Sequence, residues 1–253
     1  MLATRIRAMG VAHWLVLFGL ILAGWIALWL MAVPAETRAL SKIYGAEFWI
    51  SLCLSTPSIA GYFNLFLMWA LMAAAMMLPT ALPALATYDD LSQSTDTNFA
   101  LLTTGYLVIW LGFAAVAAGL QIGLFQLGLL DGLGTSQSAV FSAVLLAIAG
   151  GYQFSPIKEA CLAKCRMPLT FFMEHWEEGP FKMGVRLGAV CLGCCWALML
   201  LGFVGGVMSL GFMGLATIIM IIEKMPDYGK YISAPLGFGL LGASVVMLAS
   251  VIL

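Results

Sequence analysis

The chain has 253 residues, of which 63% are hydrophobic and only 9% are charged, and its formal net charge is −1. A soluble globular domain usually has about 25% charged residues, so this chain has too few charges to build a water-exposed surface. Its mean hydropathy of +1.04 indicates an integral membrane protein, and its pI near 6.1 argues against a nucleic-acid partner. We therefore expect one integral membrane domain, residues 1–253, whose surroundings are the lipid bilayer.

Apolar segments long enough to cross a bilayer recur along the whole chain. A spanning helix needs roughly 20 mostly apolar residues, and we predict an all-α, polytopic transmembrane helix bundle of about seven spans, with six or eight as alternatives. In chain order the predicted spans are 11–33, 63–87, 99–127, 137–154, 184–205, 207–222 and 231–253. The first is too long for a cleaved signal peptide and is expected to remain as an anchor.

The basic residues predict the orientation. With the N-terminus inside, the cytoplasmic segments 1–10, 88–98, 155–183 and 223–230 hold most of the lysines and arginines. These residues, together with one at the next membrane edge, are Arg5, Arg7, Lys158, Lys164, Arg166, Lys182, Arg186, Lys224 and Lys230. Since lysine and arginine bias sets topology, we predict N-in/C-out. The reducing cytoplasm then keeps nearby cysteines as free thiols.

Five of the six cysteines are clustered in the sequence: Cys161, Cys165, Cys191, Cys194 and Cys195. Residues three or four apart share a helical face, so the first two pair if 156–166 is a helix, and the last three form one stripe on the fifth span. Thiolates are soft ligands; two or three suit Cu(I), whereas four in a tetrahedron would suit zinc. The alternative is that these cysteines are simply small buried hydrophobic residues.

Methionines supply further soft donors. Met68, Met72 and Met76 lie four residues apart on one face of the second span, and Met77 follows directly. Met199 continues the cysteine stripe one turn further along the fifth span. We regard Met72, Met76, Met77 and Met199 as candidate thioether ligands, although methionine is also ordinary filler in a lipid-facing helix.

Two prolines, Pro79 and Pro83, fall in the cytoplasmic third of the second span. Each removes a backbone hydrogen bond, so we expect this part of the helix to kink. Carbonyl groups left unpaired at such a kink commonly line a site in membrane proteins.

The remaining polar features carry weaker signals. Glu174, His175, Glu177 and Glu178 offer oxygen and nitrogen donors, but an interfacial amphipathic helix within 155–183 explains them more simply. Cys53 stands alone, in an apolar segment too short to span, and receives no role. Phosphate-binding glycine loops, HExxH and G-x-S-x-G are absent from the sequence, so we do not expect an enzyme.

Three sequence strings resemble a known family. They are Tyr152-Gln153 with Pro156, Lys158, Cys161, Cys165 and Pro168; Gly193-Cys194-Cys195-Trp196 running on to Met199, Met208, Met213 and Glu223-Lys224; and Ala75-Met76-Met77 with Pro79. Over about residues 65–225 the chain resembles the bacterial family of predicted metal-binding integral membrane proteins, formerly a domain of unknown function, whose members are often labelled copper chaperones. Leu187 stands where members often carry a histidine. The resemblance implies copper supply to a cuproenzyme and a multi-pass protein of a bacterial inner (plasma) membrane.

The resulting hypothesis is a membrane protein that binds Cu(I) and helps deliver it to a copper enzyme. The alternative is a metal-free accessory subunit of a larger membrane complex, which the small-residue helices and short loops fit equally well. A solute transporter is less favoured, because transporters usually keep ionisable groups at mid-membrane and none is evident there.

Overall fold

The computed structural model describes residues 11–32, 49, 51–91 and 97–252. Within these ranges the chain is all-helical, as predicted, and contains no β-strand beyond one isolated bridge between Leu130 and Ser136. The helices are α2 (Val11–Ala32), α5 (Ile59–Asp90), α6 (Phe99–Gln126), α7 (Ala139–Tyr152), α8 (Pro156–Arg166), α9 (Pro168–His175), the 3-10 turn η3 (Trp176–Glu178), α10 (Pro180–Leu200), α11 (Gly202–Gly205), α12 (Leu210–Glu223) and α13 (Gly229–Ile252).

Five helices of the described chain are long and apolar enough to cross a membrane: α2, α5, α6, α10 together with α11, and α13. A sixth candidate is the pair α7 and α8, which is bent by 61° at its break. The predicted sixth span corresponds to α12, whose 14 residues rise only about 21 Å, less than the roughly 30 Å of a bilayer core. Five to six candidate spans are therefore established, and the predicted total of seven is not confirmed.

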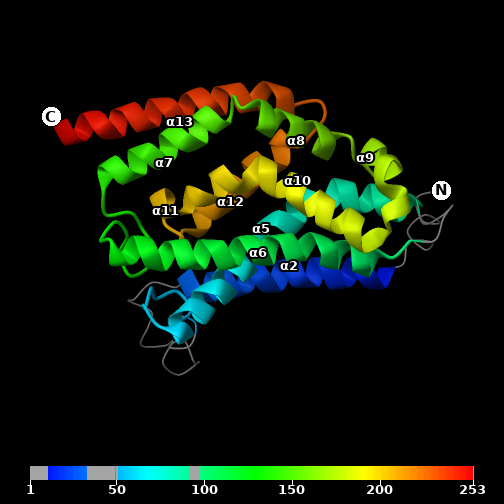
Figure 1. Cartoon of the computed structure of the whole chain (residues 1–253), viewed down its shortest axis with the longest axis horizontal. Helices are drawn as coiled ribbons and strands as arrows, with labels where there is room; N and C mark the ends of the chain where they lie inside the picture. Colours follow the sequence, from blue (N-terminus) through cyan, green and yellow to red (C-terminus); the bar gives the residue numbers. More distant parts are fainter. Residues whose placement is uncertain (1–10, 33–48, 50, 92–96, 253) are drawn as a thin grey trace.

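The long helices lie roughly parallel or antiparallel along the longest axis of the molecule (Figure 1). α2 begins at one end of that axis, and α13 finishes at the other. The most extensive helix contacts join α10 to α6, α13 to α7, and α5 to both α6 and α2. α5 and α10 are the most buried of the candidate spans, so they form the centre of the bundle.

Glycines allow α10 to approach α6 closely. A Cβ atom added to Gly184 would overlap the carbonyl oxygen of Leu102, and one added to Gly105 would overlap that of Phe181. Gly188, one turn along from Gly184, faces the carbonyl of Tyr106 in the same way. This is the small-residue packing that holds helices together in membranes, where burial of apolar surface gives little driving force. It fixes α10 against α6 beside the cysteine stripe.

α5 continues through both of its prolines as one helix of 32 residues. Pro79 has no N–H to donate to the carbonyl of Ala75, and the indole Nε1 of Trp25 on α2 donates to that carbonyl instead, at 3.0 Å. The nearby carbonyl of Met77 accepts from the hydroxyl of Tyr106 at 2.9 Å. A neighbouring helix thus satisfies the carbonyl that Pro79 leaves free, which is one way proline is tolerated in a spanning helix.

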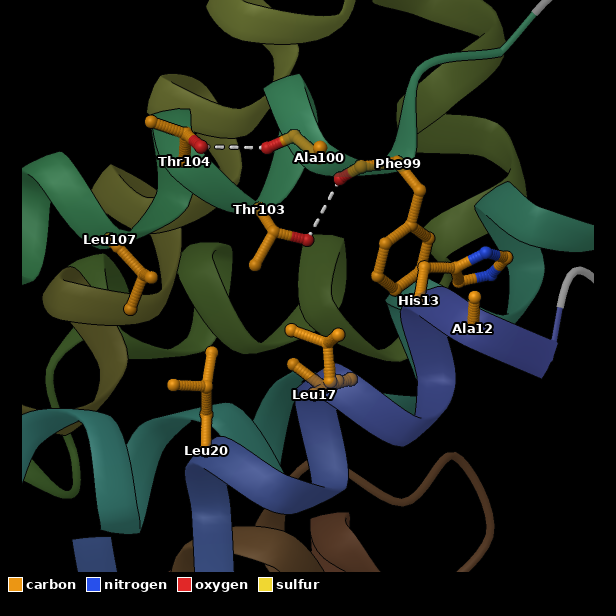
Figure 2. Close-up of a pocket in the computed structure, with 10 residues that line it drawn as sticks. Ala12, His13, Leu17, Leu20, Phe99, Ala100, Thr103, Thr104 and Leu107 are labelled. Carbon is orange, nitrogen blue, oxygen red and sulfur yellow. Dashed lines mark hydrogen bonds between the residues drawn. The ribbon is translucent and has the colours of Figure 1, made fainter. Parts of the chain in front are cut away.

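A cavity of about 440 Å³ lies between α2 and α6 (Figure 2). The hydroxyls of Thr103 and Thr104 donate to carbonyls one turn back on α6, so the two residues offer mainly methyl groups to the cavity. None of its described lining residues carries sulfur. This apolar cavity is therefore distinct from the sulfur-rich centre of the bundle.

Candidate metal centre

The thiols of α10 form one compact buried cluster. Cys191, Cys194 and Cys195 are each only 1% exposed, and their sulfur atoms all lie within 4.8 Å of one another. The Sγ atoms of Cys194 and Cys195 are 3.2 Å apart. In the part of the chain that the structure describes, no other group of three cysteine, histidine or acidic side chains converges in this way. The predicted stripe is therefore a cluster able to hold a metal ion; below, these three residues are called the thiol cluster.

A buried lysine faces this cluster from α12. The Nζ of Lys224 lies 2.9 Å from the Sγ of Cys191 and donates to Thr80 Oγ1 at 2.7 Å. The hydroxyl of Tyr106 lies 3.1 Å from the same sulfur. A buried ammonium needs a partner, and a thiolate at Cys191 is a suitable one. Sequence reasoning missed this contact; its only signal was a lysine directly after an apolar helix.

The two cysteine groups meet in space. α8 has the predicted bounds between Pro156 and Pro168, and Cys161 packs on α10, where a Cβ atom added to Gly193 would lie 2.6 Å from its sulfur. Cys165 lines a small cavity together with Cys191 and Lys224. Both α8 cysteines are half-buried, whereas the thiol cluster is fully buried. The thiols therefore form a gradient of exposure from α8 to the interior.

A buried ion pair anchors α8 beside the cluster. Lys158 Nζ lies 2.9 Å from Glu223 Oε2, and both side chains are 1% exposed. Ser233 on α13 donates to the other carboxylate oxygen at 3.0 Å, and Arg166 Nε donates to the Glu223 carbonyl at 3.0 Å. Glu223 thus joins α8, α12 and α13, while the next residue, Lys224, points into the thiol cluster.

Methionines gather in a second small cavity further along α5 and α10. Met72, Met76, Met199 and Met213 all line it, and each is at most 3% exposed. Below, this cavity is called the methionine cavity. Met213 on α12 was not a predicted candidate. Met77 is also fully buried but is not among the residues that line this cavity.

Comparison with known families agrees with this geometry. Residues 66–247 match the family described as copper chaperone (PpoB2). The chain belongs to this copper chaperone family. No curated protein and no solved structure matches it. The predicted resemblance is thereby confirmed, and membership of a copper chaperone family suggests a non-catalytic role.

The acidic and histidine side chains of 174–178 are not part of the thiol cluster. His175 Nδ1 lies 2.8 Å from the carbonyl of Phe171, one turn earlier. Glu178 accepts from Arg186 at 2.5 Å, and this hydrogen bond lowers the pKa of its carboxyl group. These contacts fit a segment at the surface of the protein.

One further thiol lies at the opposite end of the bundle. Cys53 Sγ is 3.2 Å from the thioether sulfur of Met208, and Cys53 is only 1% exposed. Burial raises the pKa of the Cys53 thiol to about 12. Sequence reasoning gave Cys53 no role because 155 residues separate it from this partner.

Proposed function

We propose that the protein lies in a bacterial inner membrane, binds Cu(I) through its cysteines and hands the ion to a copper enzyme. The observation that carries this proposal is the thiol cluster with the Lys224 ammonium beside it. Soft thiolates select soft metal ions, and the ion is here a cargo that enters and leaves.

Charge balance supports a monovalent ion held by two thiolates. Two thiolates and one Cu(I) together carry one negative charge, which the ammonium of Lys224 neutralises. In a buried site an uncompensated charge is costly, so this combination is favourable where the whole cluster is about 99% shielded from solvent.

The gradient of exposure suggests a direction of transfer. Cys161 and Cys165 are half-buried and would capture Cu(I) first, before passing it to the thiol cluster. Cys165 already shares a cavity with Cys191. Ligand exchange between neighbouring thiols lets an ion move without being released to solvent.

The methionine cavity would hold the ion more weakly. Thioethers are neutral, so they bind Cu(I) without the charge attraction of a thiolate. Met199 is one turn, about 6 Å, beyond Cys195, and Met76 is one turn from Thr80, which contacts the cluster through Lys224. Met77, on the same helix, remains a proposed donor. Progressively weaker ligands keep the ion from being trapped.

The arrangement of the helices supports termini on opposite sides of the membrane, and the lysine and arginine bias favours N-in/C-out. α2 begins and α13 finishes at opposite ends of the long axis (Figure 1), as an odd number of crossings requires. With α7 and α12 counted as short spans, the total is seven. The α8 cysteines then lie on the cytoplasmic side, where thiols stay reduced.

Copper content of the purified protein tests the proposal. We expect at least one tightly bound Cu(I) per chain after Cu(I) loading of detergent-purified protein under reducing conditions, and protection of the clustered thiols from alkylation. A Cys191→Ser, Cys194→Ser, Cys195→Ser triple variant should lose most of this copper and fail to deliver it, while eluting from a sizing column like the parent. Unchanged binding and delivery in the triple variant would refute the proposal. A parent protein that retains no metal would favour the accessory-subunit alternative.

A further inference from the structure

Cys53 and Met208 bring two soft sulfur donors into contact away from the thiol cluster. The thiol lies before α5 and the thioether lies in the turn between α11 and α12, yet their sulfur atoms are 3.2 Å apart. Cys53 is fully buried, whereas Met208 is half-buried. The pair therefore connects the interior of the bundle with its surface at this end.

A buried hydrogen-bond chain holds the Cys53 segment in position. Ser55, two residues on, donates its backbone N–H to the carbonyl of Gly132 at 2.8 Å and accepts from the Gln121 amide at 3.0 Å. The Oε1 of Gln121 in turn accepts from Trp69 Nε1 at 2.7 Å. Trp69 is three residues, or about one helical turn, before Met72 on α5. The segment that holds Cys53 is therefore fixed close to the methionine cavity.

Met208 is also connected to the methionine cavity, through the first turn of α12. Ser209, the next residue, caps α12 by accepting from Phe212 N, and Phe212 lines the methionine cavity beside Met213. The sulfur atoms thus follow one order along the bundle: the thiol cluster with the α8 cysteines beside it, then the methionine cavity, and then Cys53 with Met208.

From this order we infer that Cys53 and Met208 form a second, two-sulfur Cu(I) site, the last one before the ion leaves the protein. The inference rests on the proposed function and extends it. Binding would break the S–H bond of Cys53 and form an S–Cu bond, with the proton released to water and the oxidation states unchanged. One thiolate and one thioether bind Cu(I) more weakly than several thiolates do, which suits a site of release.

The number of Cu(I) ions bound per chain, in the parent and in the thiol-cluster triple variant, tests the inference. Detergent-purified parent, Cys53→Ala and Met208→Leu would be titrated with Cu(I) against a competing chelator, with Met183→Leu as a matched control at a buried methionine of α10. Both test variants should bind about one Cu(I) fewer per chain at saturation than the parent and the control. The thiol-cluster triple variant should keep a weak Cu(I) that disappears when Cys53→Ala is added. Because leucine replaces methionine with little change in volume, Met208→Leu keeps the test valid if Cys53→Ala folds poorly.

The outcomes separate this inference from the proposed function. Full copper content in both Cys53→Ala and Met208→Leu, with loss only in the triple variant, would overturn the second site and leave the function standing. A parent that binds no Cu(I) would overturn both. Release to an external chelator from protein reconstituted in vesicles should slow at least tenfold in Met208→Leu, and an unchanged rate would contradict a role in exit.

Discussion

The ammonium of Lys224 lies where a two-thiolate Cu(I) complex would leave a negative charge. The contact joins residues 33 positions apart, and it exists only because α12 packs beside α10 and α5. Cys191, Cys194 and Cys195 were predictable because their spacing is local to one helix. Lys224 was not, because a lysine at a helix end reads equally well as a side chain that reaches for the membrane surface.

Replacing Lys224 with methionine should weaken Cu(I) binding. Methionine keeps most of the volume but removes the positive charge, so we expect the dissociation constant to rise about tenfold, equivalent to about 1.4 kcal/mol. Lys230→Met is the control, since Lys230 is exposed and contacts the ring of Tyr231 rather than a thiol. Competition titration with a Cu(I) chelator measures both. Equal affinities in the two variants would show that the charge of Lys224 does not contribute.

The buried thiol of Cys53 should react slowly with alkylating agents in metal-free protein. Burial disfavours the charged thiolate, so the pKa is raised to about 12 and the reactive form is scarce at pH 8. Alkylation of Cys53, followed by mass spectrometry, should be at least tenfold slower in the folded protein than in the denatured chain, and should accelerate as the pH rises toward 12. Equal rates at pH 8 would contradict this environment.

At the scale of helices, α8 was predicted correctly, because Pro156 and Pro168 mark its two ends in the sequence. They also gave α6 to within one residue at its C-terminal end, since 99–127 was expected and Phe99–Gln126 is observed. How the helices pack was not predictable. The Lys158–Glu223 ion pair and the support of the Ala75 carbonyl by Trp25 both depend on contacts between distant segments.

The close contact between α6 and α10 predicts opposite effects for two glycines. Gly184→Ala should destabilise the protein by about 1–3 kcal/mol, because the added methyl meets the backbone of α6. Gly112 is on α6 and faces open space. Gly112→Ala should therefore stabilise the protein by about 0.5–1 kcal/mol, since glycine costs conformational entropy in a helix. Thermal unfolding in detergent, read by circular dichroism, compares them. Similar unfolding temperatures would mean that α6 and α10 do not pack this closely.

For the whole molecule, composition alone was sufficient to predict a membrane-embedded helical bundle. The number of crossings is a harder problem, because α7 and α12 have only 14 residues each. A helix of that length can cross a locally thinned bilayer or stop inside the protein, and apolar periodicity does not distinguish these cases. The side on which the turn after α12 lies therefore decides the topology.

Accessibility of two engineered cysteines distinguishes seven crossings from six. In a background without the native cysteines, Leu133→Cys would report on the α6–α7 connection and Asp227→Cys on the turn after α12; both positions are exposed. With an N-in/C-out bundle of seven spans, a membrane-impermeant maleimide should label Leu133→Cys on intact cells and Asp227→Cys only in inverted vesicles. Labelling of both from outside would mean that α12 turns back without crossing. α13 would then run inward, and the C-terminus would share the cytoplasmic side with α8 and its pair of cysteines.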